Sequence, residues 1–484
     1  MRSPLRRSHP VLAVAAVLSV QSCDTAPVSR LENLKTPDAI SELEERIPVL
    51  LDSGQVTGMA VAVTSDTGLI WSRGFGLRSA DTREPVTEET VFEAASLSKP
   101  VFALAVLKLV DQGLIDLDAP ISDFYAYDDI AHDERGRLIT PRMVLTHSAG
   151  FPNWRPRGGQ LTIDREPGTE FSYSGEGFVY LQRAVVALTG ETLEQLAWRL
   201  VFEPLGMLSS SYIWQDRFEG VVAFPHSSDG EVLDKQRPGP GGGNAAASLH
   251  TTAPDYARFL MAVMNGNGLS DSTAAAMLTP QIQIDSSLAW GLGIGLEDTD
   301  QGRAFWHWGD NTGYKAYAIA YPEHRVGVVW FTNSENGHSI LGRMLAATVG
   351  GEHPAVQWLD YEAYDSPKRV VREALESTVA ERGVEAAISE YHRMKATHPP
   401  EAFDEFLLNG LGYWLLRANR VQDAIAIFEL NVAEYPDASN PYDSLGEAYL
   451  AAGDTARAVS SYEKSVELDP GNANGLSVLA RIRR

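Results

Sequence analysis

A serine stands three residues ahead of a lysine in the segment Ser96-Leu97-Ser98-Lys99. A serine hydroxyl is a poor nucleophile unless a neighbouring group takes its proton. A lysine one helical turn further along the chain lies on the same face of a helix as the serine. This spacing therefore predicts an acyl-transfer enzyme in which Ser96 attacks a carbonyl carbon with Lys99 beside it.

The residues after Lys99 indicate a helix that is buried on all sides. Pro100 is tolerated in a first helical turn, where its missing N–H would be unbonded in any case. Residues 101–110 are apolar except for Lys108. A serine at the start of such a helix lies near free backbone N–H groups and the positive end of the helix dipole, which favour a developing oxyanion.

The same short motif occurs a second time, in Ser461-Tyr462-Glu463-Lys464. There the helical pattern is amphipathic, with Glu463, Lys464 and Glu467 on the side that faces water. We interpret this copy as structural, because short motifs match by chance and only their context separates the two cases.

Length and charge limit the class of protein. With 484 residues the chain exceeds the usual size of one hydrophobic core, so two or more domains are expected. Lys and Arg number 40 against 64 Asp and Glu, a formal net charge of -24. This charge repels polyanions and argues against nucleic acid as a partner.

Residues 1–27 have the pattern of an export signal. Three arginines lie among the first seven residues, and residues 11–20 form an apolar stretch too short to span a bilayer. The sole cysteine, Cys23, follows in Val20-Gln21-Ser22-Cys23, which resembles a bacterial lipobox and would make Cys23 a lipidation site. Gln21 departs from the usual small residue, so simple cleavage stays an alternative. We expect a periplasmic or extracellular protein, with a lipid anchor if Cys23 is modified.

Hydrophobic patterns predict strands near both ends of the first two thirds of the chain. A β-hairpin is expected over residues 59–75, and later strands are expected over residues 290–297, 303–308, 316–321 and 326–332. Residues 89–264 carry mostly helical patterns and Pro/Gly loops. This order predicts an α+β domain with an antiparallel sheet in which the two ends of the domain meet.

From about residue 367 the pattern changes to consecutive helices. Four residues recur after 34 positions: Gly412, Ala424, Phe428 and Pro436 return as Gly446, Ala458, Tyr462 and Pro470. This period predicts the paired helices of tetratricopeptide repeats, with a degenerate half-repeat from Gly383 to Pro399 helping to cap them. We therefore expect a first domain over residues 28–346, a linker over 347–370 and an all-helical repeat domain over 371–484.

Three further segments follow Ser96 and Lys99: Leu-Thr-His-Ser-Ala-Gly-Phe at residues 145–151, Pro-Gly-Thr-Glu-Phe-Ser-Tyr-Ser-Gly at 167–175, and His-Trp-Gly-Asp at 307–310. In this order the motifs resemble the serine β-lactamase and penicillin-binding protein family. The resemblance is to its class C branch, with D-Ala-D-Ala carboxypeptidases, D-aminopeptidases and carboxylesterases. It covers about residues 47–346 and implies an antiparallel sheet flanked by helices plus an all-helical region.

The resemblance also implies a role for each matching residue. Ser96 is the nucleophile, and Lys99 and Tyr173 are the base and the proton shuttle, in an order that the sequence leaves open. Free lysine has a pKa of about 10.4, so burial or a cationic neighbour must lower the pKa of Lys99.

The third motif faces these residues. His307 opens a strand triplet that ends at Gly309, and the backbone N–H groups of Ser96 and Asp310 would form the oxyanion hole. His147, in the second segment, is interpreted as a structural hydrogen-bonding residue. A structural Tyr173 and a surface His307 remain alternatives at this stage.

Two positions depart from the family pattern. The tyrosine motif is usually Tyr-x-Asn, whereas Gly175 ends it here, so no side-chain amide is present to bind a substrate amide. The strand triplet usually begins with lysine, and His307 would offer a weaker hold on a substrate carboxylate that depends on pH. Both changes favour esters or small D-amino-acid peptides over β-lactams.

Two functions fit these observations. The first is an exported serine hydrolase that forms an acyl-enzyme on Ser96 and acts on a small ester or peptide. The second is a non-catalytic lipoprotein scaffold whose repeats recruit a protein partner. The chain has neither a Gly-x-Ser-x-Gly elbow nor a His-Glu-x-x-His motif, and we expect no metal and no cofactor. The intact Ser96, Lys99 and Tyr173 favour the enzyme.

Overall fold

The computed structural model describes residues 30–482 apart from residues 236 and 240. The expected export signal and Cys23 lie outside the described residues. An eight-stranded antiparallel sheet forms the centre of the first domain, in the order β2-β1-β10-β9-β8-β7-β6-β5. Its strands are β1 Gly58–Ser65, β2 Leu69–Gly76, β5 Ile282–Gln283, β6 Leu288–Trp290, β7 Gly295–Thr299, β8 Gly302–Asn311, β9 Tyr314–Tyr321 and β10 Val326–Thr332. A separate ribbon pairs β3 Phe92–Glu93 with β4 His250–Thr251.

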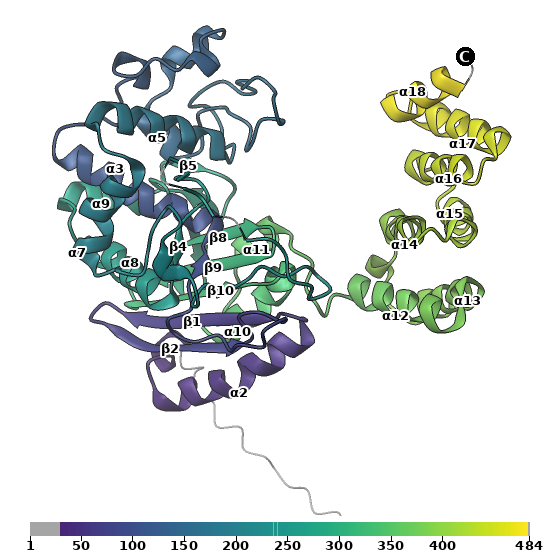
Figure 1. Ribbon diagram of the computed structural model, residues 1–484, viewed down its shortest axis with the longest axis horizontal. Helices are drawn as coiled ribbons and strands as arrows, with labels where there is room; N and C mark the ends of the chain where they lie inside the picture. Colours follow the sequence, from purple (N-terminus) through teal and green to yellow (C-terminus); the bar gives the residue numbers. More distant parts are fainter. Residues whose placement is uncertain (1–29, 236, 240, 483–484) are drawn as a thin grey trace, which may run out of the picture.

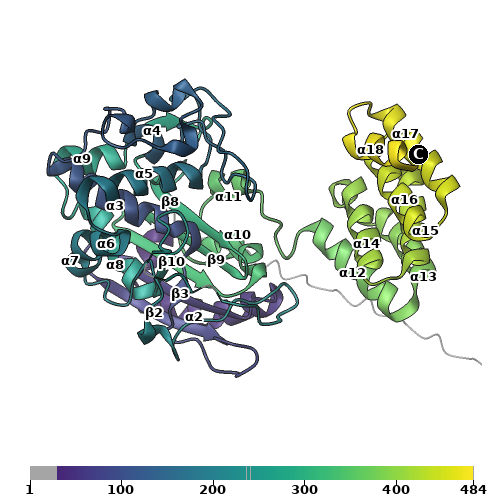
Figure 2. The same cartoon turned by 45° about the horizontal axis from the view of Figure 1, so that its top comes forward.

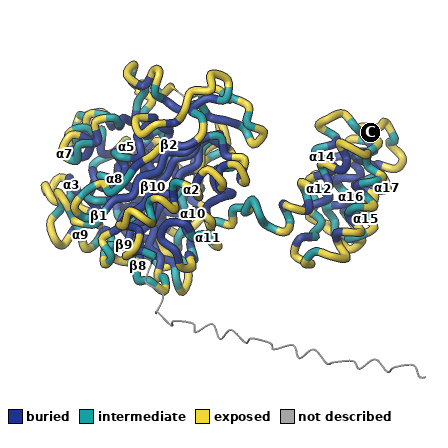
Figure 3. Tube along the Cα trace, turned by 90° about the horizontal axis from the view of Figure 1, so that it is seen from below, coloured by how far each residue is buried: buried dark blue, intermediate teal, exposed yellow. Residues whose placement is uncertain are grey.

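Helices cover both faces of this sheet (Figure 1). One face carries α1 Arg30–Asn33, α2 Pro37–Ser53, α10 Leu341–Ala347 and α11 Pro354–Leu359. The other carries α3 Ser98–Asp111, α4 Pro141–Leu145, α5 Gly175–Thr189, α6 Leu193–Ala197, α7 Glu203–Leu205, α8 Ala253–Asn265 and α9 Asp271–Met277. Alternate residues of β1 join different cores, Ala60 and Ala62 on one face and Val61 and Val63 on the other. Figure 3 accordingly shows the central strands as a buried layer.

The antiparallel α+β fold confirms the prediction from sequence. One predicted strand is wrong, because residues 290–297 do not form a continuous element: β6 ends at Trp290 and β7 begins at Gly295. Between them Gly293 has a φ of +83°, and a Cβ there would lie 2.2 Å from the Cβ of Ala103 on α3. Only glycine fits at this position, because the chain has a positive φ there and passes directly against the helix that follows Ser96.

The C-terminal part is all helical and forms a group of helices of its own (Figures 1 and 2). Its elements are α12 Pro367–Arg382, α13 Val384–Lys395, α14 Glu405–Arg417, α15 Val421–Glu434, α16 Ser439–Ala451, α17 Thr455–Leu468 and α18 Ala473–Ile482. Gly412 packs on the ring of Phe428, where a Cβ would lie 2.4 Å away. Gly446 packs on Tyr462 in the same way, at 2.9 Å. The same helix contact thus recurs at the spacing seen in the sequence.

The segment expected to be a linker, residues 347–370, is largely packed onto the first domain. Ala355 is fully buried in the same core as α2 and α10, and Trp358 and Tyr361 pack against that core. The buried carboxylate of Glu297 accepts a hydrogen bond from the Ala355 N–H, at 3.1 Å, and its Oε1 lies 2.7 Å from His353 Nδ1. The first domain therefore continues past residue 346, and aromatic residues of this segment reach the candidate site. Among the described residues, no helix is both long and apolar enough to cross a membrane.

Candidate active site

Ser96 lies in a single 3-10 turn, Ala95–Leu97, directly ahead of α3. Ala95, the residue before it, has a φ of +49°, a conformation that is uncommon for residues other than glycine and often occurs at functional sites. Ser98 stabilises this turn, because its hydroxyl donates to the Ala95 carbonyl at 2.5 Å and accepts from the Leu249 N–H at 2.9 Å. The turn leaves Ser96 partly exposed while its neighbours are buried.

Lys99 is fully buried and contacts the hydroxyl of Ser96. Its Nζ lies 2.9 Å from Ser96 Oγ and 2.8 Å from the carbonyl oxygen of Ala246. Burial lowers the pKa of Lys99 to about 7, because the charged ammonium loses its hydration in the protein interior. A large fraction of Lys99 is therefore neutral near pH 7, with a lone pair that can accept the proton of Ser96.

The second Ser-x-x-Lys segment forms no such pair. Ser461 is buried on α17, and Lys464 Nζ bonds Glu467 at 3.0 Å. The structural interpretation of this copy agrees with these contacts.

Tyr173 lies beside Lys99 at the end of an extended segment that leads into α5. Its ring centroid is 4.8 Å from Lys99 Nζ. Ser174 caps the helix, since its Oγ accepts the Gly177 N–H at 3.0 Å. Burial raises the pKa of the Tyr173 hydroxyl, and the nearby Ser96 hydroxyl lowers it by less. Tyr173 is therefore protonated at neutral pH and can donate a proton.

His307, on β8, is buried and uncharged. Its Nδ1 lies 2.7 Å from the carbonyl oxygen of Trp308, and a carbonyl only accepts, so Nδ1 carries the proton. Nε2 is then a bare acceptor, and it is buried without a hydrogen-bond partner among the described residues. Burial, followed by the charge of Lys99, lowers the pKa of His307 to about 3. The alternative that His307 is a surface residue is therefore wrong, and its low pKa gives no support to a charged imidazole that holds a substrate carboxylate.

Acidification should destabilise the fold through His307. The unfolded chain takes up a proton on this residue below a pH of about 6.5, whereas the folded chain does so only near 3, so the free energy of unfolding falls between these values. At pH 5 the loss amounts to about 2 kcal/mol. Urea unfolding at pH 7 and pH 5 measures it. The free energy of unfolding of His307→Gln, whose side chain cannot titrate, should fall by less between pH 7 and pH 5. An equal fall in the parent and the variant would contradict the burial of a neutral His307.

His147 connects the second segment to the tyrosine motif. It has a φ of +54°, and its Nδ1 accepts the Ser174 N–H at 3.0 Å. Its ring lies 4.2 Å from that of Tyr173, centroid to centroid. Burial, with smaller effects of Lys99 and His307, lowers the pKa of His147 well below its usual value, so the ring is neutral. These contacts fit a residue that positions Tyr173.

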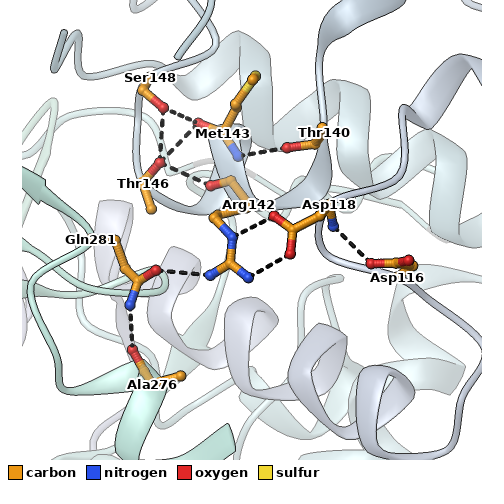
Figure 4. A network of polar contacts seen from close by, with 9 residues as sticks. All are labelled: Asp116, Asp118, Thr140, Arg142, Met143, Thr146, Ser148, Ala276 and Gln281. Atoms are coloured by element: carbon orange, nitrogen blue, oxygen red, sulfur yellow. Dashed lines mark hydrogen bonds and ion pairs between the residues drawn. The ribbon is translucent and has the colours of Figure 1, made fainter. Parts of the chain in front are cut away.

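A polar network fixes the helix that leads into this segment (Figure 4). Arg142 on α4 forms two hydrogen bonds with Asp118, at 2.7 and 2.8 Å, and a third with Gln281 at 2.8 Å. The Thr146 hydroxyl donates to the Arg142 carbonyl at 2.9 Å. Thr146, the residue before His147, is thereby bonded to α4, and Arg142 on α4 is in turn bonded to Asp118 and Gln281.

The third motif approaches Ser96 closely because it contains glycine. A Cβ at Gly309 would lie 2.5 Å from the carbonyl oxygen of Ala94, so any larger residue would push β8 away from the turn that carries Ser96. Asp310 follows on the same strand, and its carboxylate contacts Lys315 Nζ at 2.9 Å and the Tyr361 hydroxyl at 2.6 Å. Burial would raise the pKa of Asp310, but Lys315 and Tyr361 together lower it, so the group stays ionised.

Aromatic side chains to which the sequence analysis gave no role line one side of the site. The ring of Trp308 lies 4.6 Å from that of Tyr173, and Trp358 lies 5.6 Å from Trp308 and 5.9 Å from Phe171, centroid to centroid. Trp358 and Tyr361 belong to the segment expected to be a linker. The only feature of the sequence that could have indicated Trp358 and Tyr361 is the presence of large aromatic residues in an expected linker.

A serine hydrogen-bonded to a buried lysine, with a tyrosine beside the lysine and an antiparallel sheet covered by helices, is the arrangement of a serine hydrolase. The Beta-lactamase family model matches residues 43–348, and the chain belongs to this family.

The curated relatives in this family include penicillin-binding proteins and esterases. Penicillin-binding protein 4 of Amycolatopsis lactamdurans is 26% identical over 329 residues, which cover 60% of this chain and 84% of that protein. Esterase EstB of Burkholderia gladioli is 29% identical over 184 residues, which cover 32% of this chain and 47% of that protein.

Two solved structures share the fold. The octameric penicillin-binding protein homologue from Pyrococcus abyssi has a TM-score of 0.56 and 23% identity, covering 70% of this chain and 81% of that one. The D-alanine carboxypeptidase AmpC from Burkholderia cenocepacia has a TM-score of 0.56 and 18% identity, covering 64% and 99%.

Proposed function

We propose that this protein is an exported serine hydrolase that forms an acyl-enzyme on Ser96 and prefers uncharged esters, or small peptides without a nearby carboxylate, to β-lactams. The observation that carries the proposal is the contact of Ser96 Oγ with Lys99 Nζ at 2.9 Å, together with a pKa of about 7 for Lys99. A nucleophile needs a base that is partly unprotonated at the working pH, and Lys99 meets this requirement.

The opposite pKa changes of Lys99 and Tyr173 support Lys99 as the base and Tyr173 as the proton donor, the roles that we propose here. Ser96 Oγ attacks the carbonyl carbon, and its proton passes to the lone pair of Lys99 Nζ. Tyr173 donates its proton to the leaving oxygen or nitrogen as that bond breaks, and regains a proton from Lys99. Water then attacks the acyl-enzyme, with the proton transfers reversed. The N–H groups of Ser96 and Asp310 are proposed to stabilise the oxyanion in both steps.

The charges around the third motif support an uncharged substrate. His307 is neutral, and the Asp310 carboxylate, three residues further along β8, is ionised and partly exposed. Lys315 is buried and already engaged by Asp310 and Glu335, each at 2.9 Å. A substrate carboxylate would therefore meet a negative charge and an uncharged imidazole, where the family pattern has lysine.

A matched pair of esters tests this preference. We expect p-nitrophenyl methyl succinate to have a kcat/KM at least about 10-fold above that of p-nitrophenyl succinate, whose free carboxylate is repelled by Asp310. Asp310→Asn should narrow the difference, because it removes the charge and keeps the shape. Equal rates for the two esters, or a preference for the charged one, would contradict the proposed substrate class.

The helical region supports a second, additional role. Its recurring contacts at Gly412 and Gly446 fit tetratricopeptide repeats, which we propose bind a protein partner or brace the enzyme. The scaffold alternative assigns the whole function to this region. A chain ending at Ser366 keeps α11, Trp358 and Tyr361 and should therefore hydrolyse small esters within about 3-fold of the full chain. Loss of all turnover in a folded truncated protein would favour a role of the repeats in catalysis.

Export and anchoring are proposed from sequence alone. The charged start, the apolar stretch and the position of Cys23 support a cleaved signal with lipidation at Cys23. Cys23→Ser separates lipidation from simple cleavage, because it should release the protein from the membrane fraction only if Cys23 carries the lipid.

A further inference from the structure

The space beside Gly175 is filled by Trp154. An ideal Cβ at Gly175 would lie 2.4, 2.5 and 2.8 Å from three atoms of the indole ring, Cζ2, Cη2 and Cε2. The backbone at Gly175 does not require glycine, because its φ is not in the left-handed region. A side chain at position 175 would therefore collide with Trp154, and the indole lies where the missing asparagine of the Tyr-x-Asn pattern would begin.

Hydrogen bonds on both sides of Trp154 fix it to the start of α5. The Asn153 carbonyl accepts the N–H groups of Gly175, at 3.0 Å, and Glu176, at 3.1 Å. Arg155 bonds both carboxylate oxygens of Glu176, at 2.9 and 2.8 Å, and reaches Asp129 at 2.9 Å. The segment that carries the indole is thus attached to the helix that begins two residues after Tyr173.

Despite these attachments Trp154 is 46% exposed. A large aromatic residue that is held in place and still open to solvent leaves apolar surface uncovered. The Cβ of Tyr173 and the position of a Cβ at Gly175 lie on the same side of the chain. The reason is that Ser174 between them is extended, with a φ of -142° and a ψ of 120°. The indole packed at Gly175 therefore lies on the same side of the chain as the Tyr173 side chain, two residues further along.

We propose that Trp154 is a specificity-determining residue that binds an aromatic or branched apolar group on the acyl part of the substrate. This inference rests on the proposed acyl-enzyme function and names its acyl group more closely. An asparagine at position 175 would present an amide there, whereas the indole presents a flat apolar face. An apolar acyl group gains by covering that face, and an acylamino group would find no partner for its polar atoms there.

The test compares two esters with the same leaving group, p-nitrophenyl acetate and p-nitrophenyl phenylacetate. The full chain should prefer the phenylacetate, and Trp154→Ala should reduce that preference by about 10-fold while changing acetate hydrolysis by less than about 3-fold. Trp154→Phe, which keeps an aromatic face, should retain most of the preference. Equal loss with both esters, no change with either, or a loss that follows the leaving group instead of the acyl group would overturn the proposal.

A binding measurement separates this inference from the proposed function. If the full chain hydrolyses neither ester, the proposed function fails. Phenylacetamide binding to the full chain and to Trp154→Ala, measured by calorimetry, then decides the role of Trp154 without turnover. Weaker binding by about 10-fold in the variant supports the inference, and equal or absent binding overturns it.

A reciprocal exchange adds a gain-of-function test. Gly175→Asn alone should lower the Tm, because its Cβ meets the indole, and adding Trp154→Ala should restore it. The double variant should shift its preference from phenylacetyl towards N-acetylglycyl p-nitrophenyl ester. If Gly175→Asn alone is as stable as the parent and keeps the phenylacetyl preference, Trp154 does not control this space and the proposal is wrong.

Discussion

Replacing Ser96 by alanine should lower the kcat/KM for an activated ester by about 10⁴-fold or more, because the variant lacks the Ser96 hydroxyl that would form the acyl-enzyme. The fold should be unaffected. Ser96 is only partly buried, and the contact of its side chain is with Lys99. Steady-state kinetics with p-nitrophenyl butyrate, and thermal unfolding of the same samples, measure the two effects.

Ser461→Ala is the matched control, since it removes the serine of the second Ser-x-x-Lys segment on α17. This variant should keep the activity of the parent. A Ser96→Ala protein that still turns over the ester at the parental rate, or an inactive one that has also lost its fold, would leave the assignment of the nucleophile without support.

Lys99→Met should cost about 10³-fold or more in kcat/KM and should also change the pH dependence. In the parent, Lys99 accepts the proton of Ser96 only when it is neutral, so activity should rise as the pH increases through about 7, the pKa that burial gives to Lys99. Methionine fills the same buried space without titrating. The residual activity of the variant should therefore show no transition near pH 7.

Lys108→Met provides the control for burial. Lys108 lies on the same helix, its Nζ donates to the Leu200 carbonyl at 2.7 Å, and burial lowers its pKa as well. It makes no contact with Ser96, so its replacement should affect stability and leave the transition near pH 7 in place. A transition that disappears with Lys108 and persists without Lys99 would show that another group is the base.

The parts of the site that lie close together in sequence could be predicted, and the parts made by packing could not. Ser96 and Lys99 are one helical turn apart, so their contact follows from local geometry. The strands on either side were predicted from hydrophobic patterns, because each buries alternate residues on different cores. The predicted strand over residues 290–297 is interrupted around Gly293, where Ala103 on a helix distant in sequence leaves no room for a side chain.

Charge states were also hidden from the sequence. The sequence suggested that His307 is a weaker, pH-dependent substitute for a lysine, but its burial lowers its pKa and leaves the ring neutral. Trp358 and Tyr361 lay in an expected linker and instead line the site. Trp154 gave no signal at all, because its relation to Gly175 exists only after the chain has brought the two together.

The most direct test of the central claim is the intact mass of the protein after rapid quenching with p-nitrophenyl butyrate and, separately, with a penicillin. The account predicts a butyryl adduct on the peptide that contains Ser96, absent from Ser96→Ala, and little or no penicilloyl adduct under the same conditions. A butyryl adduct on another residue, or a penicilloyl adduct that forms faster than the butyryl one, would contradict it.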